Sequence, residues 1–573
     1  MRGSNIKQLW EGAMELPNLR IMDLADSRKL KMCPDFTNVS SLVELNFGGC
    51  ISLVNVHSSI GGLKKLSFLN LGYTSIQSVP TGMQLESLWI LILHSCKKLA
   101  SIPENLGNME SLSHLTLDSS GVANFETSIV NHPRLVFLSM VGCKNLVNLP
   151  TAITQLESLE ELFLNGCVYL KNIPDTVEKM VSLRTLELKH CRELRGLPNS
   201  ICQIKSLVRV FLQDCPELER LPENLGDMES LEHLGVSGTG IKELPFSIVN
   251  LQKLETLEMD GCKEITFNSL RSFFLTVLGT SSMKHTPLSG CLTTLSLSNC
   301  SLRSIPQEIY CFKSLECLHL KGNDFEHLPL TMKRLSKLQT LSLSDCKRLE
   351  QIPELSGSLS SLIANDCLSL RTLWSVSVYQ KIKVFQFRNC LKLADNNNFP
   401  IEVILSSQFQ GNYALQGTGF LIIYPGDVIP KWFNHTIGDN GASLYIQLPQ
   451  NWFIKFLGFV ICVVLEKQIE EKAKGLKLIE TFLADCYYDS FMFPALKCIE
   501  DSTMLIYYNK RPLDNHPYAD QIRKDGVELT MKFVGEVKVK SCAIRVICKG
   551  DQTLGNVEEE GDLVSCAKKP RHY

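Results

Sequence analysis

One short pattern, LxxLxLxxC, recurs along most of this chain, with Leu, Met, Val or Phe accepted at the apolar positions. Sixteen copies can be traced, from Leu19 to Ile382, although the last position is not always Cys. From Leu135 to Leu231 successive copies are 24 residues apart. A constant period of this length predicts that the chain stacks one small unit on the next, because a single repeat cannot bury its own apolar face.

Each repeat has two recognisable parts. In the Leu-x-Leu part, the leucines point inward from a short strand and their neighbours point outward. The Cys position then turns the chain, and a proline such as Pro150 or Pro198 comes next, in a place typical of the first turn of a short helix. This pattern predicts an α/β leucine-rich-repeat solenoid, a horseshoe with a parallel sheet on its concave side.

The repeats set the expected domain limits. Residues 1–394 are assigned to the solenoid, with about sixteen repeats. The step from Leu254 to Leu292 is 38 residues, so an insertion is expected near 263–291. It contains Phe273, Phe274 and Leu275, so part of this stretch is expected to pack on the solenoid.

The chain has 22 cysteines, and eleven of them stand at the turn position of a repeat. Neighbouring ones should lie about 5 Å apart, one strand spacing, which is within disulfide reach. In a reducing cytosol they would instead remain buried thiols. A linear row does not converge on one point as a tetrahedral metal site must, so no metal is expected. The turn cysteines are Cys50, Cys96, Cys143, Cys167, Cys191, Cys215, Cys262, Cys300, Cys346, Cys367 and Cys390.

Composition excludes several classes of partner. The 58 Lys and Arg residues are balanced by 60 Asp and Glu residues, which argues against direct nucleic-acid binding. The start of the chain has no apolar leader, and the longest apolar run, 456–465, is far shorter than the roughly 20 residues of a membrane helix. We therefore expect no membrane partner and a cytoplasmic location, with the nucleus as a second compartment.

The outward positions of the strands are the candidate binding surface. They mix charges of both signs with large apolar groups, a composition that suits a protein partner. The alternative is that equivalent side chains on adjacent strands only pack against each other and stabilise the sheet. The candidates are Trp89, Ile92, His94, Phe137, Glu161, Phe163, Arg184, Lys189, Arg209, Phe211 and Asp214.

The repeat ends at Cys390, and a different pattern begins after it. Residues 395–418 begin with the polar run Asp-Asn-Asn-Asn-Phe and are expected to form a linker. Residues 419–549 contain short strand-like runs separated by turn residues, which predicts an all-β sandwich. Residues 550–573 are expected to be a disordered tail.

Residues 424–433, Tyr-Pro-Gly-Asp-Val-Ile-Pro-Lys-Trp-Phe, resemble the PGxxIPxWF signature of one domain. That jelly-roll/Ig-like domain, the C-JID, comes after the repeats of plant TIR-NB-LRR disease-resistance proteins. The Cys-ended repeats and the opening segment 6–12 are similar to the same family, whereas Ala543 stands where its closing strand usually has Gly. The matching motif positions are Pro425, Gly426, Ile429, Pro430, Trp432, Phe433, Trp452, Gly458 and Cys542.

The resemblance implies the effector-recognition and autoinhibitory half of an intracellular immune receptor. Its partners would be a pathogen effector or a host guardee. The sequence contains no GxxxxGK[ST] phosphate loop, so ADP or ATP would require the nucleotide-binding (NB-ARC) part that this chain lacks, and no cofactor is expected. The NAD-cleaving TIR part is also absent, and no HExxH or GxSxG motif occurs, so the chain is not expected to be an enzyme.

Alternatives remain at this point. The chain opens in the middle of a repeat, as a fragment, a truncated gene product or a free-standing sensor would. A free-standing chain would act as an adaptor or regulatory scaffold that binds other host receptors, including an intact NB-LRR receptor. An extracellular leucine-rich-repeat inhibitor is less favoured, because it would need a signal peptide and paired capping cysteines.

Overall fold

The computed structural model divides into two compact units, Met1–Cys300 and Ser301–Tyr573, and each is described by itself. The structure describes residues 1–80, 85–102, 109–123, 132, 134–279, 286–373, 382–395, 401, 404–405, 419–426, 428–433, 435–437, 443–447, 456–465, 477–482, 488–492, 503–510, 528–534 and 539–548.

The first unit is built on short parallel strands, each beginning two residues after the first leucine of a sequence repeat. Leu159, for example, precedes β7, and Leu162 of β7 is paired in register with Leu186 of β8. The described strands are β1 (Ile21–Asp23), β2 (Glu44–Asn46), β3 (Phe68–Asn70), β4 (Ile90–Ile92), β5 (His114–Thr116), β6 (Phe137–Ser139), β7 (Glu161–Phe163), β8 (Thr185–Glu187), β9 (Arg209–Phe211), β10 (His233–Gly235), β11 (Thr256–Glu258) and β12 (Thr294–Ser296).

The leucines form the core because the strand turns every second side chain inward. Leu159, Leu162 and Leu164 of one repeat are all buried, as are Leu183, Leu186 and their equivalents in the other repeats. Stacking these layers removes apolar surface from water that no single repeat could cover. The prediction of a leucine-rich-repeat fold with a parallel sheet is confirmed.

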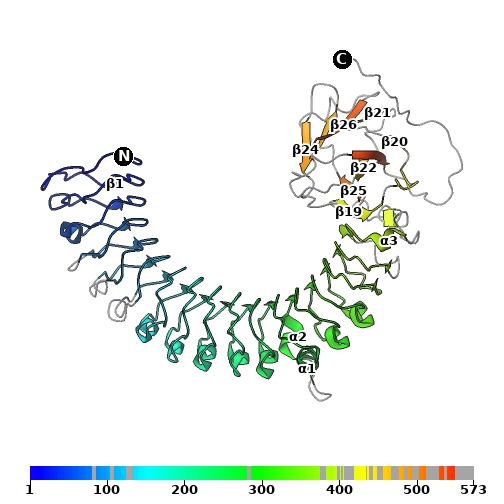
Figure 1. Cartoon of the computed structure of the whole chain (residues 1–573), viewed down its shortest axis with the longest axis horizontal. Helices are drawn as coiled ribbons and strands as arrows, with labels where there is room; N and C mark the ends of the chain where they lie inside the picture. The colour runs from blue at the N-terminus through cyan, green and yellow to red at the C-terminus, as the bar shows by residue number, and fades with distance from the viewer. Residues whose placement is uncertain are drawn as a thin grey trace. The chain divides into compact units, whose positions relative to one another are not determined.

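In six of the described repeats of this unit a short 3₁₀ helix lies on the side opposite the strands (Figure 1). Pro150, Pro198 and Pro245 stand at N-cap positions with extended backbone, one residue before the first turn where the sequence pattern placed them. The helices of this unit are η1 (Ser58–Gly62), η3 (Thr151–Gln155), η4 (Val177–Lys179), η5 (Asn199–Gln203), η6 (Leu225–Asp227) and η7 (Phe246–Asn250).

The insertion folds into two helices, α1 (Phe267–Leu278) and α2 (Pro287–Cys291). The side chain of Thr266 caps α1 by accepting a hydrogen bond from the backbone N–H of Ser269 at 3.1 Å. As expected, part of the insertion packs on the repeats: Phe273 and Phe274 are buried, whereas Leu275, on the outward side of the helix, is 44% exposed.

The turn cysteines form a row of thiols that joins each repeat to the one before it. Cys167 donates to the carbonyl of Met140 at 3.1 Å, and Cys191 donates to the carbonyl of Leu164 at 3.2 Å. All eleven turn cysteines make the equivalent bond, and all are buried free thiols. Burial in the apolar turn raises the pKa of Cys167 to about 12 and that of Cys215 to about 11.

The residue before each turn cysteine has a left-handed backbone. Asp214 has φ 59° and His190 has φ 60°, and a glycine takes the same place in other repeats, as Gly166 does with φ 71°. Gly, Asn, Asp and His adopt this conformation more readily than other residues do. The conformation of the turn therefore explains which residue types stand at this position, and partner binding is not needed to explain them.

The second unit continues the same pattern. Its repeat strands are parallel neighbours in the order β13, β14, β16, β18, and β15 pairs with β17 beside them. The described elements are η8 (Gln307–Cys311), β13 (Cys317–His319), η9 (Leu330–Arg334), β14 (Thr340–Ser342), β15 (Gln351–Ile352), β16 (Ser361–Ile363), β17 (Thr372–Leu373), β18 (Val384–Gln386) and α3 (Leu391–Asp395).

The C-terminal region of this unit contains two sheets whose strands are mainly antiparallel, as the sandwich prediction requires. One runs in the order β19, β25, β22, β27, β20, and the other in the order β21, β26, β23, β24. The strands are β19 (Gly419–Pro425), β20 (His435–Ile437), β21 (Ser443–Gln447), β22 (Phe456–Leu465), β23 (Lys477–Phe482), β24 (Tyr488–Met492), β25 (Thr503–Lys510), β26 (Glu528–Val534) and β27 (Val539–Cys548).

The last repeat and the C-terminal region share one sheet. β19 pairs in parallel with β18, and the backbone N–H of Phe387 donates to the carbonyl of Ile423 at 2.8 Å. Ile404 and Leu405, which fall in the expected linker, are fully buried, so this part is not a solvated spacer. The expected tail, 550–573, lies outside the described residues.

We expect the thiol row to make stability sensitive to alkaline pH. The pKa values of Cys167 and Cys215 lie above the ordinary 9.0 only in the folded state. Their stabilising contribution is therefore complete below pH 9 and is lost as the pH rises through the folded pKa values. By pH 10 the loss should be roughly 1 kcal/mol per thiol.

Urea unfolding at pH 7.5 and pH 10 checks this prediction. The Cys167→Ala/Cys215→Ala variant should lose less stability between the two pH values than the native chain. An equal loss in both proteins would show that the two thiols are not responsible.

Candidate protein-binding surface

An aromatic row crosses four adjacent repeats on the outward side of the strands. The ring of Trp89 meets His114 edge-on with centroids 5.4 Å apart, and His114 stacks on Phe137 at 5.6 Å. Phe137 in turn lies 5.3 Å from Phe163. The register of β5 and β6 places His114 directly beside Phe137, whereas Phe163 is paired with Ser139 and reaches Phe137 diagonally across β6 and β7.

The aromatic row is both packed and exposed. Its members touch each other, as the lateral-packing alternative predicted, yet Trp89 remains 53% exposed and Phe137 and Phe163 remain half-buried. His94 makes a similar pair with Tyr73, with centroids 4.6 Å apart. Rings held in place by their neighbours lose little conformational freedom on binding, so lateral packing favours a role as binding anchors.

The strand segments that carry Trp89, His114 and Phe137, and the segment of the repeat before them, are almost uncharged, whereas Phe163 lies on the next segment, with Glu160 and Glu161. Residues 67–73, 89–95, 113–119 and 136–142 contain one Asp, Asp118, and no Glu, Lys or Arg. The carboxylate of Asp118 accepts hydrogen bonds from the hydroxyl of Ser139 and the backbone N–H of Val141. We call these four segments the apolar sector.

The next repeats, β7 to β9, carry charges of both signs, and some of these charges are paired with each other. Asn165 donates to Glu187 at 2.6 Å, and Lys189 forms an ion pair with Glu187 at 3.4 Å. The Lys189 ammonium also lies 4.4 Å from the ring centre of Phe211. We call residues 160–166, 184–190 and 208–214 the mixed sector.

Other predicted residues of the mixed sector lie at its surface. Asp214 lies 3.1 Å from His190, an ion pair when the imidazole is protonated. Glu161 is half-buried on β7. Arg184 and Arg209 are exposed and make no ion pair with any described residue.

Gly235 allows a hydrogen bond to cross one whole repeat. Gln213 donates to Glu258 at 3.1 Å, although β10 lies between their strands. A Cβ atom at Gly235 would lie 2.2 Å from Nε2 of Gln213, so any side chain there would block this path. The absence of a side chain at Gly235 therefore allows this hydrogen bond to link the mixed sector to β11.

The outward surface of the segments around β10 and β11 is acidic. Segments 232–238 and 255–261 contain four acidic residues and no Lys or Arg. Glu258 accepts from Gln213, and Asp260 accepts from the hydroxyl of Ser296 and the backbone N–H of Ser298. We call Glu232, Glu255, Glu258 and Asp260 the acidic sector.

The C-terminal motif residues lie mainly in the interior of their domain. Trp432 and Phe433 are buried and meet edge-on at 5.2 Å. The guanidinium of Arg545 lies 4.4 Å above the Trp432 ring and donates to the carbonyl of Trp432 at 2.6 Å. This contact ties the motif to β27.

The remaining motif positions have structural places or lie outside the described part. Pro425 and Pro430 are buried, and Ile429 is half-buried. Cys542 is buried in β27, and Gly458 is in β22. Gly426 has φ 157° next to the Tyr424 ring. Trp452 falls outside the described residues.

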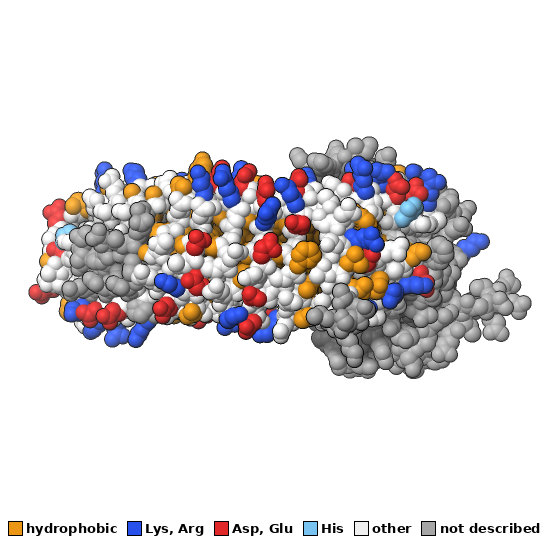
Figure 2. Space-filling view, turned by 90° about the horizontal axis from the view of Figure 1, so that it is seen from below, with side chains coloured by type: hydrophobic (Ala, Val, Ile, Leu, Met, Phe, Trp, Pro, Cys, Tyr) orange, Lys and Arg blue, Asp and Glu red, His pale blue; other side chains and the backbone are white. Residues whose placement is uncertain are grey.

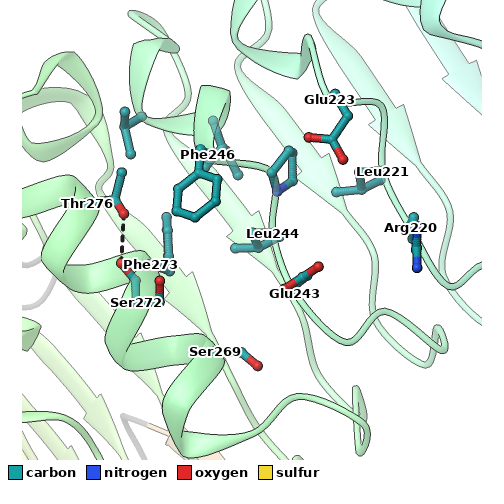
Figure 3. Close-up of a pocket in the computed structure, with 13 residues that line it drawn as sticks. Arg220, Leu221, Glu223, Glu243, Leu244, Phe246, Ser269, Ser272, Phe273 and Thr276 are labelled. Carbon is teal, nitrogen blue, oxygen red and sulfur yellow. Dashed lines mark hydrogen bonds between the residues drawn. The ribbon is translucent and has the colours of Figure 1, made fainter.

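A pocket of about 110 Å³ lies between the 3₁₀ helices and the insertion. Figure 3 shows Phe246 of η7 next to Phe273 of α1. Glu223 and Glu243 lie on neighbouring loops. The pocket is lined by three charged groups, three hydroxyls and apolar side chains, and neither His nor Cys lines it. This lining contains no nucleophile–base pair of the kind that hydrolases use.

Other features of the described part restrict its chemistry. Among the described residues, no cluster of three His, Cys, Asp or Glu side chains is arranged to hold a metal ion. None of the described helices has the length and apolar character needed to cross a bilayer. Acidic and basic side chains are interspersed on the face that carries the 3₁₀ helices (Figure 2).

Sequence reasoning missed several residues of this surface. His114 connects Trp89 with Phe137, and it stands at the same repeat position as Phe137, so aligning the repeats would have found it. Gly235 and Glu258 were also missed. Only the structure shows that Gln213 reaches past the glycine.

Two family models match the chain. Residues 424–553 match the C-JID domain, and residues 179–396 match the leucine-rich repeats described as disease resistance protein RPS4B-like.

Curated relatives match over most of the chain. It is 30% identical to the TMV resistance protein N of Nicotiana glutinosa over 81% of this chain and 36% of that protein. It is 31% identical to the disease resistance-like protein DSC1 of Arabidopsis thaliana over 82% of this chain and 35% of that protein. The chain thus spans about a third of the length of these relatives. A solved leucine-rich-repeat protein of Leptospira interrogans is 21% identical, with a TM-score of 0.49, over 65% of this chain and 100% of that one.

We expect Gly235→Ala to break the hydrogen bond between Gln213 and Glu258. The added methyl group would collide with the Gln213 amide, so the free energy of unfolding should fall by roughly 1–2 kcal/mol. Gly196→Ala is the control, because its Cβ would meet nothing within 4 Å, and its effect should stay within about 0.5 kcal/mol. Urea unfolding of both variants measures the difference. Equal effects would rule out the crossing hydrogen bond as a source of stability.

Proposed function

Because the chain carries the leucine-rich repeats of disease-resistance proteins followed by a C-JID domain, we propose that it is the recognition part of a plant intracellular immune receptor. Its surface of repeats would bind a pathogen effector or a host protein that an effector modifies. The compartment in which it would act is the cytoplasm, with the nucleus as a second site.

One observation carries this proposal: the aromatic row is at least partly exposed, is held in place by its neighbours and lies mostly on the nearly uncharged apolar sector. Pre-ordered aromatic side chains are typical hot spots of protein interfaces. A continuous apolar surface on a protein usually marks an interaction site. A surface formed by the outward positions of adjacent strands can bind a partner through a large contact area and does not need a deep pocket.

The regulatory part of the proposal rests on the similar proteins. This chain covers about a third of the length of these relatives, and the word resistance stands in their names. We infer that partner binding here would shift the equilibrium between two states of a receptor whose remaining parts carry the signal. Such a shift requires that the partner bind one state more tightly than the other.

We infer, further, that this part of the receptor is not itself an enzyme. Its matched domains are repeats and a C-JID, and the pocket beside α1 has no catalytic pair in its lining. Any ADP or ATP would be bound by another part of a complete receptor.

We expect the Trp89→Ala/Phe163→Ala variant to lose partner binding while it stays folded. Removing two anchor rings should weaken the affinity roughly 100-fold or more. The measurement is surface plasmon resonance of the purified chain against a panel of pathogen effector proteins, with thermal unfolding to confirm the fold.

Phe246→Ala is the matched control for this experiment. Phe246 is an aromatic residue that is 72% exposed, but it lies on η7, away from the strands. The control variant should bind as the native chain does. An effector that binds native chain and double variant with the same affinity would refute the proposal.

A further inference from the structure

Resting on the protein-binding function proposed above, we propose a chemical description of the partner. It presents an apolar or aromatic cluster to the aromatic row and Lys or Arg side chains to the acidic sector. The two contacts would be made by one partner, which lies across the mixed sector. The proposal goes beyond protein binding in general, because it specifies which charge the partner carries and at which end.

The apolar end is inferred from the absence of charge. Across four repeats the outward positions hold one formal charge, Asp118, which is already bonded to Ser139 and Val141. A partner charge placed here would lose water and find no opposite charge in return. An apolar side chain would instead remove the exposed part of Trp89 and the half-buried rings of Phe137 and Phe163 from water.

The basic end is inferred from how the four carboxylates are held. The hydrogen-bond donors to Glu258 and Asp260 are an amide, a hydroxyl and a backbone N–H, all of them neutral. Glu232 and Glu255 form no ion pair with any described residue. Neutral donors orient a carboxylate without cancelling its charge, so the sector keeps a negative potential that a cationic partner group can meet.

Gln213 occupies the space that a side chain of β10 would fill, and its amide donates to Glu258. Glu255 is exposed, and Glu232, Glu258 and Asp260 are half-buried, so a partner can reach these carboxylates. A long Lys or Arg side chain can bond more than one carboxylate. An acidic protein segment or a nucleic-acid phosphate would meet repulsion here.

The spacing of the strands sets the distance between the two contacts. From β7, the last strand of the aromatic row, to β10 there are three strand-to-strand steps. At about 4.8 Å per step this is about 14 Å along the sheet. In the mixed sector between them Lys189 is paired with Glu187 and lies over Phe211, whereas Arg184 and Arg209 are exposed and form no ion pair with a described residue.

The test uses the full chain and two synthetic 20-residue peptides. Both begin with the same Trp-Leu-Phe-rich half, and they end in four arginines or in four glutamates. Binding is measured by isothermal titration calorimetry at 50 and 300 mM NaCl. We expect the arginine peptide to bind at least tenfold more tightly than the glutamate peptide at low salt, and this preference to shrink at high salt.

Two triple variants locate the charge effect. Glu232→Gln/Glu255→Gln/Glu258→Gln keeps side-chain size and should weaken arginine-peptide binding roughly tenfold. Glu157→Gln/Glu217→Gln/Glu264→Gln removes the same charge from exposed positions outside the strands and should change binding less than twofold. Equal weakening by both triples, or equal affinity for both peptides, would overturn the proposal.

The outcome for the acidic sector is separable from the outcome for the proposed function. If Trp89→Ala/Phe163→Ala abolishes binding of an effector while the acidic triple does not weaken it, protein recognition stands and the basic character of the partner is wrong. If neither variant weakens binding, both proposals fail.

Discussion

The contact between neighbouring repeats is the interaction on which the rest of the molecule depends. Each repeat buries its leucines only because the next repeat covers them, and its backbone completes its hydrogen bonds across the same boundary. The backbone N–H of Leu164, for example, donates to the carbonyl of Glu187 at 2.8 Å. The turn thiol adds a bond in the opposite direction, as Cys191 does to Leu164. A strand inside the stack is therefore fixed in register by both of its neighbours.

That register also organises the binding surface. Since equivalent positions fall side by side, a residue type repeated at the same position becomes a continuous row on the sheet. His114 and Phe137 are such neighbours, and Trp89 and Phe163 extend the row from other positions of the adjacent repeats. The carboxylates of β10 and β11 form another patch. The surface is thus divided into regions of different chemistry, although the whole chain is nearly neutral.

Sequence reasoning captured the features that the repeat period controls. The leucine positions predicted where the repeat strands begin, because burial alternates strictly within a strand. It did not capture features that depend on side-chain reach. The bond from Gln213 to Glu258 requires that Gly235, on the strand between them, carry no side chain. The pairing of β18 with β19 was also missed, because a polar run such as 395–399 signals a loop and carries no information on the partner of the next strand.

The shared sheet has a consequence for how this chain can be divided. A solenoid without a cap ends in an open strand edge, which is a template for unwanted pairing with other chains. Here β19 covers the edge of β18, so the C-terminal domain serves as the end cap of the repeats. A cut between the two would leave the repeats with a bare edge and the domain without a neighbouring strand. The repeats and the C-terminal domain therefore form one structural module. Loss of either part would favour aggregation of the other.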